Sequence, residues 1–352
     1  MNKNWVAMAV GGLVALPGAA LADAKIYGRF NVGLDGQKDE IGLDSKETDT
    51  TWRVQDQNNS SRLGFKGSTD IGLADMSVIY QLEYGTNPDG SESDEFSERN
   101  IFVGLKGDFG TGKVGKFDTP VKEIGAKADF FNDESIGDIT FLMVGETRAN
   151  NMIQYSTPKL GDLVTITAAV APGEGRKALD DANDKDNSVA DTYYASAEFE
   201  QGPFYGALAY AGNQEGSLKF DGATAGIDII RATAAVKLFK ALEIGALYQQ
   251  ATGIDQKNST TNDKGSDAEE TSYLASVAYT FDAFKFKFQY GQTSGDQTDI
   301  ERTEMAFGVD YKLSKALTAQ AYYVTYEDKD RIVGGIQDPQ TDSYGVGLIY
   351  SF

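Results

Sequence analysis

The sequence lacks cysteine and histidine altogether and has only 7 prolines among its 352 residues. Without cysteine the chain can form no disulfide bridge, thiolate nucleophile or iron–sulfur cluster, and without histidine it can build no Ser-His-Asp triad. Basic residues are also outnumbered, because 32 Lys and Arg stand against 53 Asp and Glu, for a net charge of −21. Nucleic-acid binding needs a basic surface, so this composition argues against a nucleic-acid partner.

Long apolar runs are missing too, apart from one near the N-terminus. That run lies between Trp5 and Leu16, follows Lys3 and is followed by small residues ending at Ala22. It is shorter than the roughly 20 residues of a membrane-spanning helix, so we interpret residues 1–22 as a secretory signal peptide cleaved after Ala22. Residues 23–352 are then expected to form a single domain that strand pairing and packing alone stabilise.

What the sequence does contain favours β-structure, since it has 39 Gly, 18 Tyr and 19 Phe. At the C-terminus Tyr344, Val346, Leu348, Tyr350 and Phe352 alternate with residues that are mostly small. The same period of two recurs over residues 284–290, 26–32 and 62–66. These segments are predicted to be strands with one apolar and one polar face. On this basis Leu348→Arg is expected to impair assembly, whereas Gly345→Ser, on the opposite face, is expected to be mild.

Two kinds of connection alternate between the predicted strands. Short ones lie at 70–72, 108–110, 158–161, 202–203, 239–240, 282–283 and 314–315. Longer acidic ones lie at about 36–58, 86–97, 119–147, 172–189, 213–225, 253–269, 294–300 and 328–341. Seven short and eight long connections join sixteen strands, and the 330 residues after residue 22 give about 21 per strand and connection, which suits transmembrane strands of about 9–11 residues.

A closed transmembrane β-barrel explains this pattern better than a soluble β-sandwich. The polar face carries Arg, Lys, Gln and Tyr, which a dry core would not accept without partners but a water-filled lumen would. A sandwich would also show no systematic difference between its two ends. We therefore predict an all-β, antiparallel barrel of about sixteen strands, with short turns at one end and long loops at the other.

Several segments resemble those of Gram-negative general diffusion porins, and the resemblance covers essentially the whole mature chain. They are IYGRF at 26–30, SRLGFKG at 61–67, RNIFVGLKG at 99–107, FGTGKVG at 109–115, RANNMIQY at 148–155 and the terminal Phe352. The resemblance implies a sixteen-stranded barrel in the outer membrane of a Gram-negative bacterium, usually a homotrimer, with short periplasmic turns and long external loops. It also implies that the third long loop, about 119–147, folds into the pore. Phe352 would be the assembly signal read by the barrel-assembly machinery, and the surrounding partners would be outer-membrane lipid and lipopolysaccharide.

In the resemblance, a basic wall facing an acidic inward loop forms the pore constriction. Alternation places Arg29, Arg62, Lys66 and Arg148 on the lumen side, as it does Arg231 and Lys285, and the resemblance adds Lys116, where relatives often carry Arg. The acidic side is expected to comprise Glu123, Asp129, Asp133, Glu134 and Asp138. Such a constriction tunes which polar solutes and ions pass.

Other candidate sites have simpler explanations. The glycine spacing of residues 110–115 matches a nucleotide-binding loop, but strand and turn residues follow it instead of a helix. The acidic clusters at 180–186 and 267–270 lack the Gly and Glu positions of a hand-type calcium loop. No carboxylate pair stands out for glycoside hydrolysis. We therefore predict no enzyme activity, no cofactor and no metal.

The predicted function is a water-filled channel for passive diffusion of small hydrophilic solutes and ions. One alternative is a substrate-selective porin, for phosphate or a sugar, which would need an aromatic or basic track of specific geometry. The other is a plugged structural or adhesive barrel whose long loops bind a partner. The ion preference stays open at this point, because acidic external loops concentrate cations while wall cations favour anions.

Overall fold

The computed structural model describes residues 24–39, 49–73, 75–91, 95–174, 176–177, 185–186, 188–220, 226–254, 268–333 and 336–352. The expected signal peptide at 1–22 lies outside these residues, and so does most of the acidic cluster at 180–186. No helix in the described ranges is long and apolar enough to cross a membrane.

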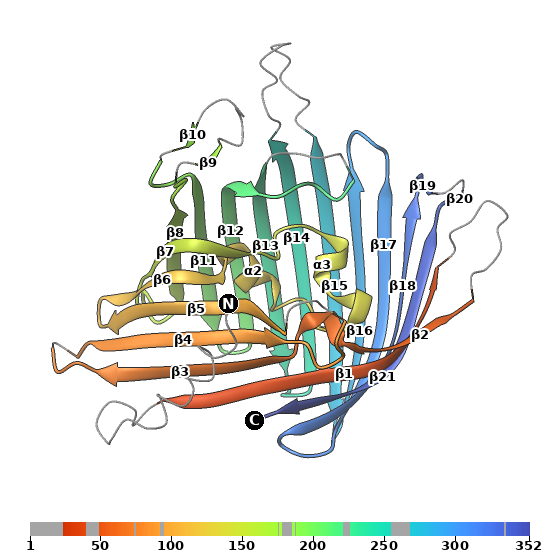
Figure 1. The fold of residues 1–352 in the computed structure, drawn as a ribbon, viewed down its shortest axis with the longest axis horizontal. Coiled ribbons are helices and arrows are strands. Elements are labelled where there is room, and N and C mark those ends of the chain that lie inside the picture. The colour runs from red at the N-terminus through yellow and green to blue at the C-terminus, as the bar shows by residue number, and fades with distance from the viewer. Residues whose placement is uncertain are drawn as a thin grey trace, which may run out of the picture.

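One antiparallel sheet makes up almost the whole molecule (Figure 1). Its first half contains β1 (Lys25–Asp39), β2 (Thr51–Asp56), β3 (Arg62–Asp70), β4 (Ser77–Thr86), β5 (Phe96–Gly107), β6 (Gly110–Asp118), β7 (Arg148–Ser156) and β8 (Val164–Ala171). Its second half contains β11 (Thr192–Gln201), β12 (Phe204–Glu215), β13 (Gly226–Leu238), β14 (Leu242–Ile254), β15 (Glu269–Phe281), β16 (Phe284–Gly295), β17 (Glu301–Lys312), β18 (Leu317–Lys329) and β21 (Gln340–Ser351). Two short ribbons, β9 (Arg176–Lys177) with β10 (Lys185–Asp186) and β19 (Ile332–Val333) with β20 (Ile336–Gln337), lie outside this sheet.

The sheet closes into a sixteen-stranded barrel, as predicted. β1 pairs with β21 from Arg29 opposite Ser351 to Asp39 opposite Thr341, which joins the two ends of the chain. β2 and β3 both pair with β1 and together occupy a single barrel position, interrupted by the short helix η1 (Gln57–Asn59). The seventeen strands of the sheet therefore occupy sixteen strand positions around the barrel. Among the described residues, closure leaves the main sheet with no unpaired edge, and a hydrocarbon environment would not tolerate such an edge.

The two faces of the strands follow the alternation read from the sequence. On β21, Val346 and Leu348 are exposed on the outer face, while Ser343 is buried. On β16, Phe284 and Phe286 are exposed on the outer face, while Lys287 is buried on the lumen face. Large apolar side chains are exposed along most strands of the sheet, as a lipid-facing barrel surface requires.

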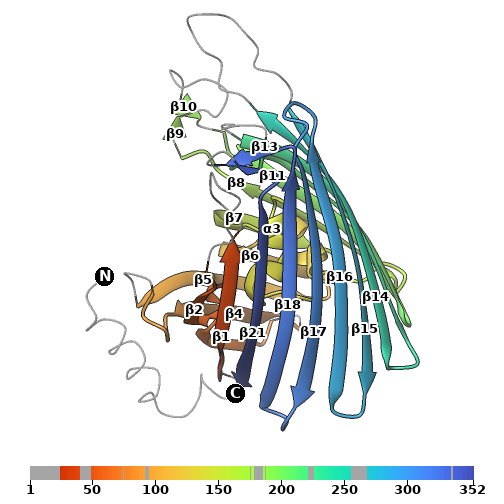
Figure 2. The same ribbon diagram turned by 90° about the vertical axis from the view of Figure 1, so that its right-hand side faces the viewer.

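The connections also match, with one correction. The short turns join the strands at the end of the barrel where the C-terminus lies, and the long loops emerge at the other end (Figure 2). The first long loop was expected at 36–58, but β1 continues to Asp39 and β2 starts at Thr51. Ladder pairing from Val32 opposite Asp56 to Gln37 opposite Thr51 extends both strands further into the expected loop.

The third long loop lies inside the barrel. It contains α2 (Pro120–Gly125), η2 (Ser135–Gly137) and α3 (Ile139–Leu142). Both views place these helices between the wall of β3–β6 and the opposite wall around β13–β16 (Figures 1 and 2). The position of this loop makes the lumen the candidate functional site.

Candidate functional site

The loop of residues 119–147 enters the lumen through a capped helix. Thr119 is the N-cap of α2 and its hydroxyl accepts a hydrogen bond from the Lys122 N–H, while Pro120 occupies the first helical turn, where its missing N–H costs nothing. Val121 and Ile124 are fully buried against the inner faces of β11–β13. Further along, a Cβ atom at Gly245 on β14 would lie 2.7 Å from the Ala128 Cα atom, so glycine there permits close approach of the loop backbone.

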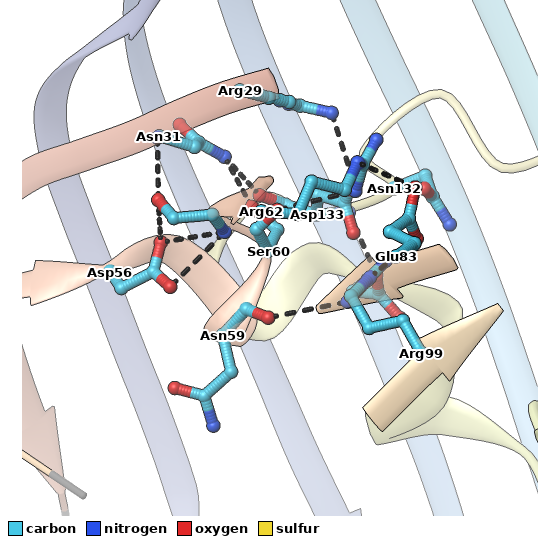
Figure 3. A network of polar contacts seen from close by, with 12 residues as sticks. Arg29, Asn31, Asp56, Asn59, Ser60, Arg62, Glu83, Arg99, Asn132 and Asp133 are labelled. Carbon is cyan, nitrogen blue, oxygen red and sulfur yellow. Dashed lines mark hydrogen bonds and ion pairs between the residues drawn. The ribbon is translucent and has the colours of Figure 1, made fainter. Parts of the chain in front are cut away.

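The tip of the loop reaches the opposite part of the wall. The Asp133 carboxylate lies 2.8 Å from Arg29 Nη1 on β1 and 3.4 Å from Arg62 Nη1 on β3. The Asn31 side chain donates to the Asp133 carbonyl oxygen at 2.8 Å. Figure 3 shows these side chains converging on Asp133. The loop thus crosses the lumen and places one carboxylate against two guanidinium groups.

The basic wall continues along neighbouring strands. Arg99 on β5 lies 2.9 Å from Glu83 Oε1, and Arg148 on β7 lies 3.1 Å from Asp118 Oδ1. Glu83 also lies 3.9 Å from Arg62 Nε, so it bridges two arginines (Figure 3).

The cluster therefore contains four arginines, Arg29, Arg62, Arg99 and Arg148, against three carboxylates, Glu83, Asp118 and Asp133. A slightly cationic wall results.

Two predicted wall cations lie elsewhere. Lys66 shares the face of Arg62 but contacts the ring of Tyr27, with Nζ 4.5 Å from its centroid, and the structure does not bring it to the loop. Lys116 pairs in register with Ile101 and lies 3.4 Å from Glu98, whose side chain is 59% exposed. The β5–β6 ladder is unshifted from the exposed pair Val103 and Val114 to Ile101 and Lys116, which puts Lys116 on the outer face and corrects its expected place in the basic wall, which came from the resemblance.

The five predicted loop acids point in different directions. Besides Asp133, Glu123 lies 3.5 Å from Lys113 of β6. Asp129 accepts hydrogen bonds from the Phe131 and Ile139 N–H groups. Asp138 accepts them from the Asp133 and Thr140 N–H groups, so both carboxylates hold turns of the loop and neither faces the wall.

Glu134 points away from Asp133, toward Lys287 on β16. Its Oε2 atom is buried with no hydrogen-bond partner among the described residues. Burial raises the pKa of Glu134 to about 7, although Lys287 opposes this shift. Burial and the neighbouring Asp138 likewise raise the pKa of Asp129.

Several residues of β16, β17 and β21 also hold the loop against the wall. Gln289 accepts a hydrogen bond from the Phe130 N–H at 3.0 Å and donates to the Gly137 carbonyl at 3.0 Å. Arg302 donates to the Phe141 carbonyl at 2.8 Å, and Ser135 contacts Ser343 at 3.1 Å. These contacts span β16 to β21 and fix the middle of the loop against the wall.

Sequence reasoning missed some of these residues. Lys113 could have been found, since it alternates with the lipid-facing Val114. Arg99 could not, because the β4–β5 register shifts between Leu82 and Tyr84, and such a bulge breaks the period of two. The β6–β7 register shifts in the same way between Gly115 and Phe117.

The arrangement is chemically suited to electrostatic selection in water. Among the described residues, no group of three or more carboxylates is placed to hold a metal ion. Residues 110–115 form strand β6, so their glycine spacing opens no helix for a phosphate. Tyr194 and Tyr322 are buried and Tyr27 donates to Glu83, so these three tyrosines form no aromatic track.

Comparisons with known proteins agree with this geometry. The family model described as Gram-negative porin matches residues 7–331 of this chain. The major outer membrane protein P.IB of Neisseria meningitidis serogroup B (strain H44/76) is 25% identical over 330 residues, which cover 91% of each chain. The P.IB protein of Neisseria lactamica is also 25% identical over 330 residues, again 91% of each chain.

Solved structures share the fold. The outer membrane channel DcaP of Acinetobacter baumannii superposes with a TM-score of 0.68 at 16% identity, covering 96% of this chain and 100% of its own. Salmonella typhi OmpF gives 0.66 at 18% identity, covering 94% and 97%. Vibrio cholerae OmpT, in its trimer form, gives 0.65 at 14% identity, covering 94% and 99%.

Proposed function

Because this chain belongs to the Gram-negative porin family and is an outer-membrane channel for passive diffusion, we propose that its arginine-lined wall and Asp133 form the charged constriction for small hydrophilic solutes and ions. The observation that carries the proposal is the contact of the Asp133 carboxylate with both Arg29 and Arg62 across the lumen. Porins are channels, and we extend this to propose that the chain has no catalytic activity.

The physical effect of such a constriction is a field across a narrow water column. Two unit charges about 10 Å apart interact by roughly 0.4 kcal/mol in bulk water and by about 1.7 kcal/mol at an effective dielectric constant of 20. At about 1.4 kcal/mol per decade, one unbalanced charge biases ion flux by about twofold to about twentyfold. Selection is therefore graded, and size exclusion dominates.

The structure supports a general channel over a solute-specific one. A sugar-selective pore would need aromatic rings along the path, yet Tyr194 and Tyr322 are 3% and 6% exposed. A phosphate-selective pore would need unpaired cations, yet each of the four wall arginines faces a carboxylate. A wall on which positive and negative side chains are paired is expected to bind many polar solutes weakly and none strongly.

Ion selectivity tests the proposal. Arg62→Ala and Arg148→Ala each remove a wall cation, so the reversal potential in a KCl gradient should shift toward cations, by about two- to tenfold in permeability ratio. Lys116→Ala is the matched control, because Lys116 is on the outer face beside Glu98, and it should leave the reversal potential unchanged. If the two arginine variants behave like the control, the constriction does not lie at this wall. Absence of any conductance in the unmodified protein would instead favour the plugged barrel.

The assembled state is proposed to be a homotrimer surrounded by outer-membrane lipid and lipopolysaccharide. The trimer form of Vibrio cholerae OmpT supports this for a protein of the same fold. An apolar groove of about 750 Å³ on the outer face, lined by residues that include Ile26, Phe65, Leu82 and Val103, offers a surface for protomer contact. We also propose that the barrel-assembly machinery reads Phe352.

A further inference from the structure

Arg231 on β13 is the largest fully buried side chain of the molecule's described part, and it lies against both ends of the inward loop. Its Nη1 atom donates to the Val121 carbonyl at 3.0 Å, at the start of the loop. Its Nη2 atom donates to the Val144 carbonyl at 2.9 Å, near the end of the loop. One guanidinium group therefore joins two segments that are more than twenty residues apart.

Two further partners complete the coordination of this guanidinium. Arg231 Nη1 lies 2.5 Å from Glu146 Oε1, and the Arg231 and Glu146 side chains are 0% and 5% exposed. Arg231 Nε donates to Gln249 Oε1 at 2.8 Å, and Gln249 Nε2 donates in turn to the Val144 carbonyl at 3.0 Å. Every nitrogen of Arg231 has an acceptor, and the pair with Glu146 is neutral and withdrawn from water.

Two glycines shape the slot for the guanidinium. A Cβ atom at Gly145 would lie 3.0 Å from Arg231 Nη2, and Gly145 has a φ of +104°, a conformation that side-chain-bearing residues rarely adopt. A Cβ atom at Gly125 would overlap Arg231 Nη1. The loop backbone thus approaches the guanidinium from both sides.

We propose that Arg231 is a positioning residue that clasps the two ends of the inward loop and so sets the width of the pore, without setting its ion preference. The inference rests on the proposed narrowing of the lumen by residues 119–147. A planar guanidinium with five donors in a fixed fork can hold two carbonyls and a carboxylate at once, whereas a lysine ammonium is a single point of charge. The middle of the loop has its own anchors at Gln289 and Arg302, so loss of Arg231 frees the ends first.

The test is single-channel recording and liposome swelling on the full-length variant Arg231→Gln/Glu146→Gln. This double variant removes both charges of the buried pair and keeps the net charge. We expect loss of the single conductance level, with added substates, and a higher size limit for uncharged sugars, while the reversal potential stays as in the unmodified protein. Arg231→Lys should give a conductance pattern and a size limit intermediate between those of the unmodified protein and the double variant. Lys237→Gln, at an exposed site of the same strand, is the control and should keep the single level.

A purely structural role would lower the unfolding temperature and leave the conductance of folded channels unaltered, and that result would overturn the proposal. If the double variant does not fold, Gly125→Ala displaces the guanidinium with all charges retained and should also add substates. A shift of reversal potential in Arg148→Ala together with unchanged conductance in the clasp variants would overturn only the clasp. No effect of either set would remove the proposed constriction as well.

Discussion

Whether a side chain faces lipid or the lumen decides how much a substitution costs at that position. Leu348 is 50% exposed on the outer face of β21, and an Arg near the bilayer midplane costs about 2–4 kcal/mol. We expect Leu348→Arg to lower the yield of folded barrel strongly, as measured by the heat-dependent gel shift. Ile349→Thr, at the next position on the lumen face, should fold normally. Equal yields would contradict the assigned faces.

The face on which Gly345 lies does not determine how much space a larger side chain would have there. Alternation puts Gly345 on the lumen side correctly, and a substitution to Ser looks harmless from the sequence. In the structure a Cβ atom at Gly345 would lie 2.8 Å from Tyr322 Cζ, beside the Asp35 carboxylate. A mild Gly345→Ser therefore stays a prediction, and it requires the ends of the Tyr322 and Asp35 side chains to move aside.

Charges on regular strands could be assigned from the sequence, and charges at bulges could not. Arg29 and Arg62 form the last pair of the β1–β3 ladder, which has no register shift, and the period of two puts both on the lumen face, where both contact Asp133. Arg99 lies in the register shift of β5, where counting residues fails. Lys116 was assigned from the resemblance against the alternation of its own strand.

At the scale of an element, the inward loop could be located from the sequence, but the directions of its side chains could not. Its length and acidity distinguish it from the short turns. Its path turns at Asp133 and Ser135, which have φ of +65° and +46°, so Asp133 and Glu134 point to opposite walls. Such a backbone has no period from which a face can be read.

The buried carboxyl of Glu134 is expected to make the stability of the protein depend on pH. Its pKa is raised from 4.5 to about 7, so the folded protein holds a proton that the unfolded chain releases. This contribution to stability is complete below the unfolded pKa and is lost as the pH rises through the folded pKa, at up to about 1.4 kcal/mol per pH unit.

Glu134→Gln should remove that pH dependence. The amide keeps an oxygen for Lys287 and replaces the buried, unpartnered Oε2 atom with an NH₂ group. We expect the unfolding temperature in detergent to rise less from about pH 8 to about pH 5 in the variant than in the unmodified protein. Glu200→Gln, which removes an exposed carboxylate, is the control. Parallel pH profiles for all three proteins would show that Glu134 does not titrate in this range.

At the scale of the whole molecule, closure depends on the seam between the first and last strands. Phe352 donates its N–H to the Gly28 carbonyl at 3.1 Å and accepts from the Gly28 N–H at 3.0 Å. Its ring centroid lies 5.7 Å from that of Tyr350 and 6.4 Å from that of Phe30. The backbone contacts would survive truncation of the side chain.

Phe352→Ala should therefore lower the amount of protein in the outer membrane more than it lowers the unfolding temperature of barrels refolded in detergent. Immunoblots of membrane fractions and thermal gel shifts measure the two quantities. Tyr350→Ala, which removes an aromatic ring from the same face of β21, is the comparison. Outer-membrane levels of Phe352→Ala equal to those of the comparison would argue against a signal specific to the last residue.

The loop is bound to the wall of β13–β17 by several backbone contacts, and it meets the side of the wall that carries the arginine cluster through Lys122, Glu123 and the tip residue Asp133, so redesign can address two separate sets of contacts. If the proposed constriction is correct, substitutions at Arg99 or Arg148 should change the charge that permeating solutes meet while the barrel and the loop keep their positions. Substitutions among the residues that bind the loop to the wall should act indirectly, by moving the loop, and should change the permeation of all solutes in the same direction. A library that varies the wall arginines would change the ion selectivity, and a library that varies the loop-binding residues would change the size limit of the pore.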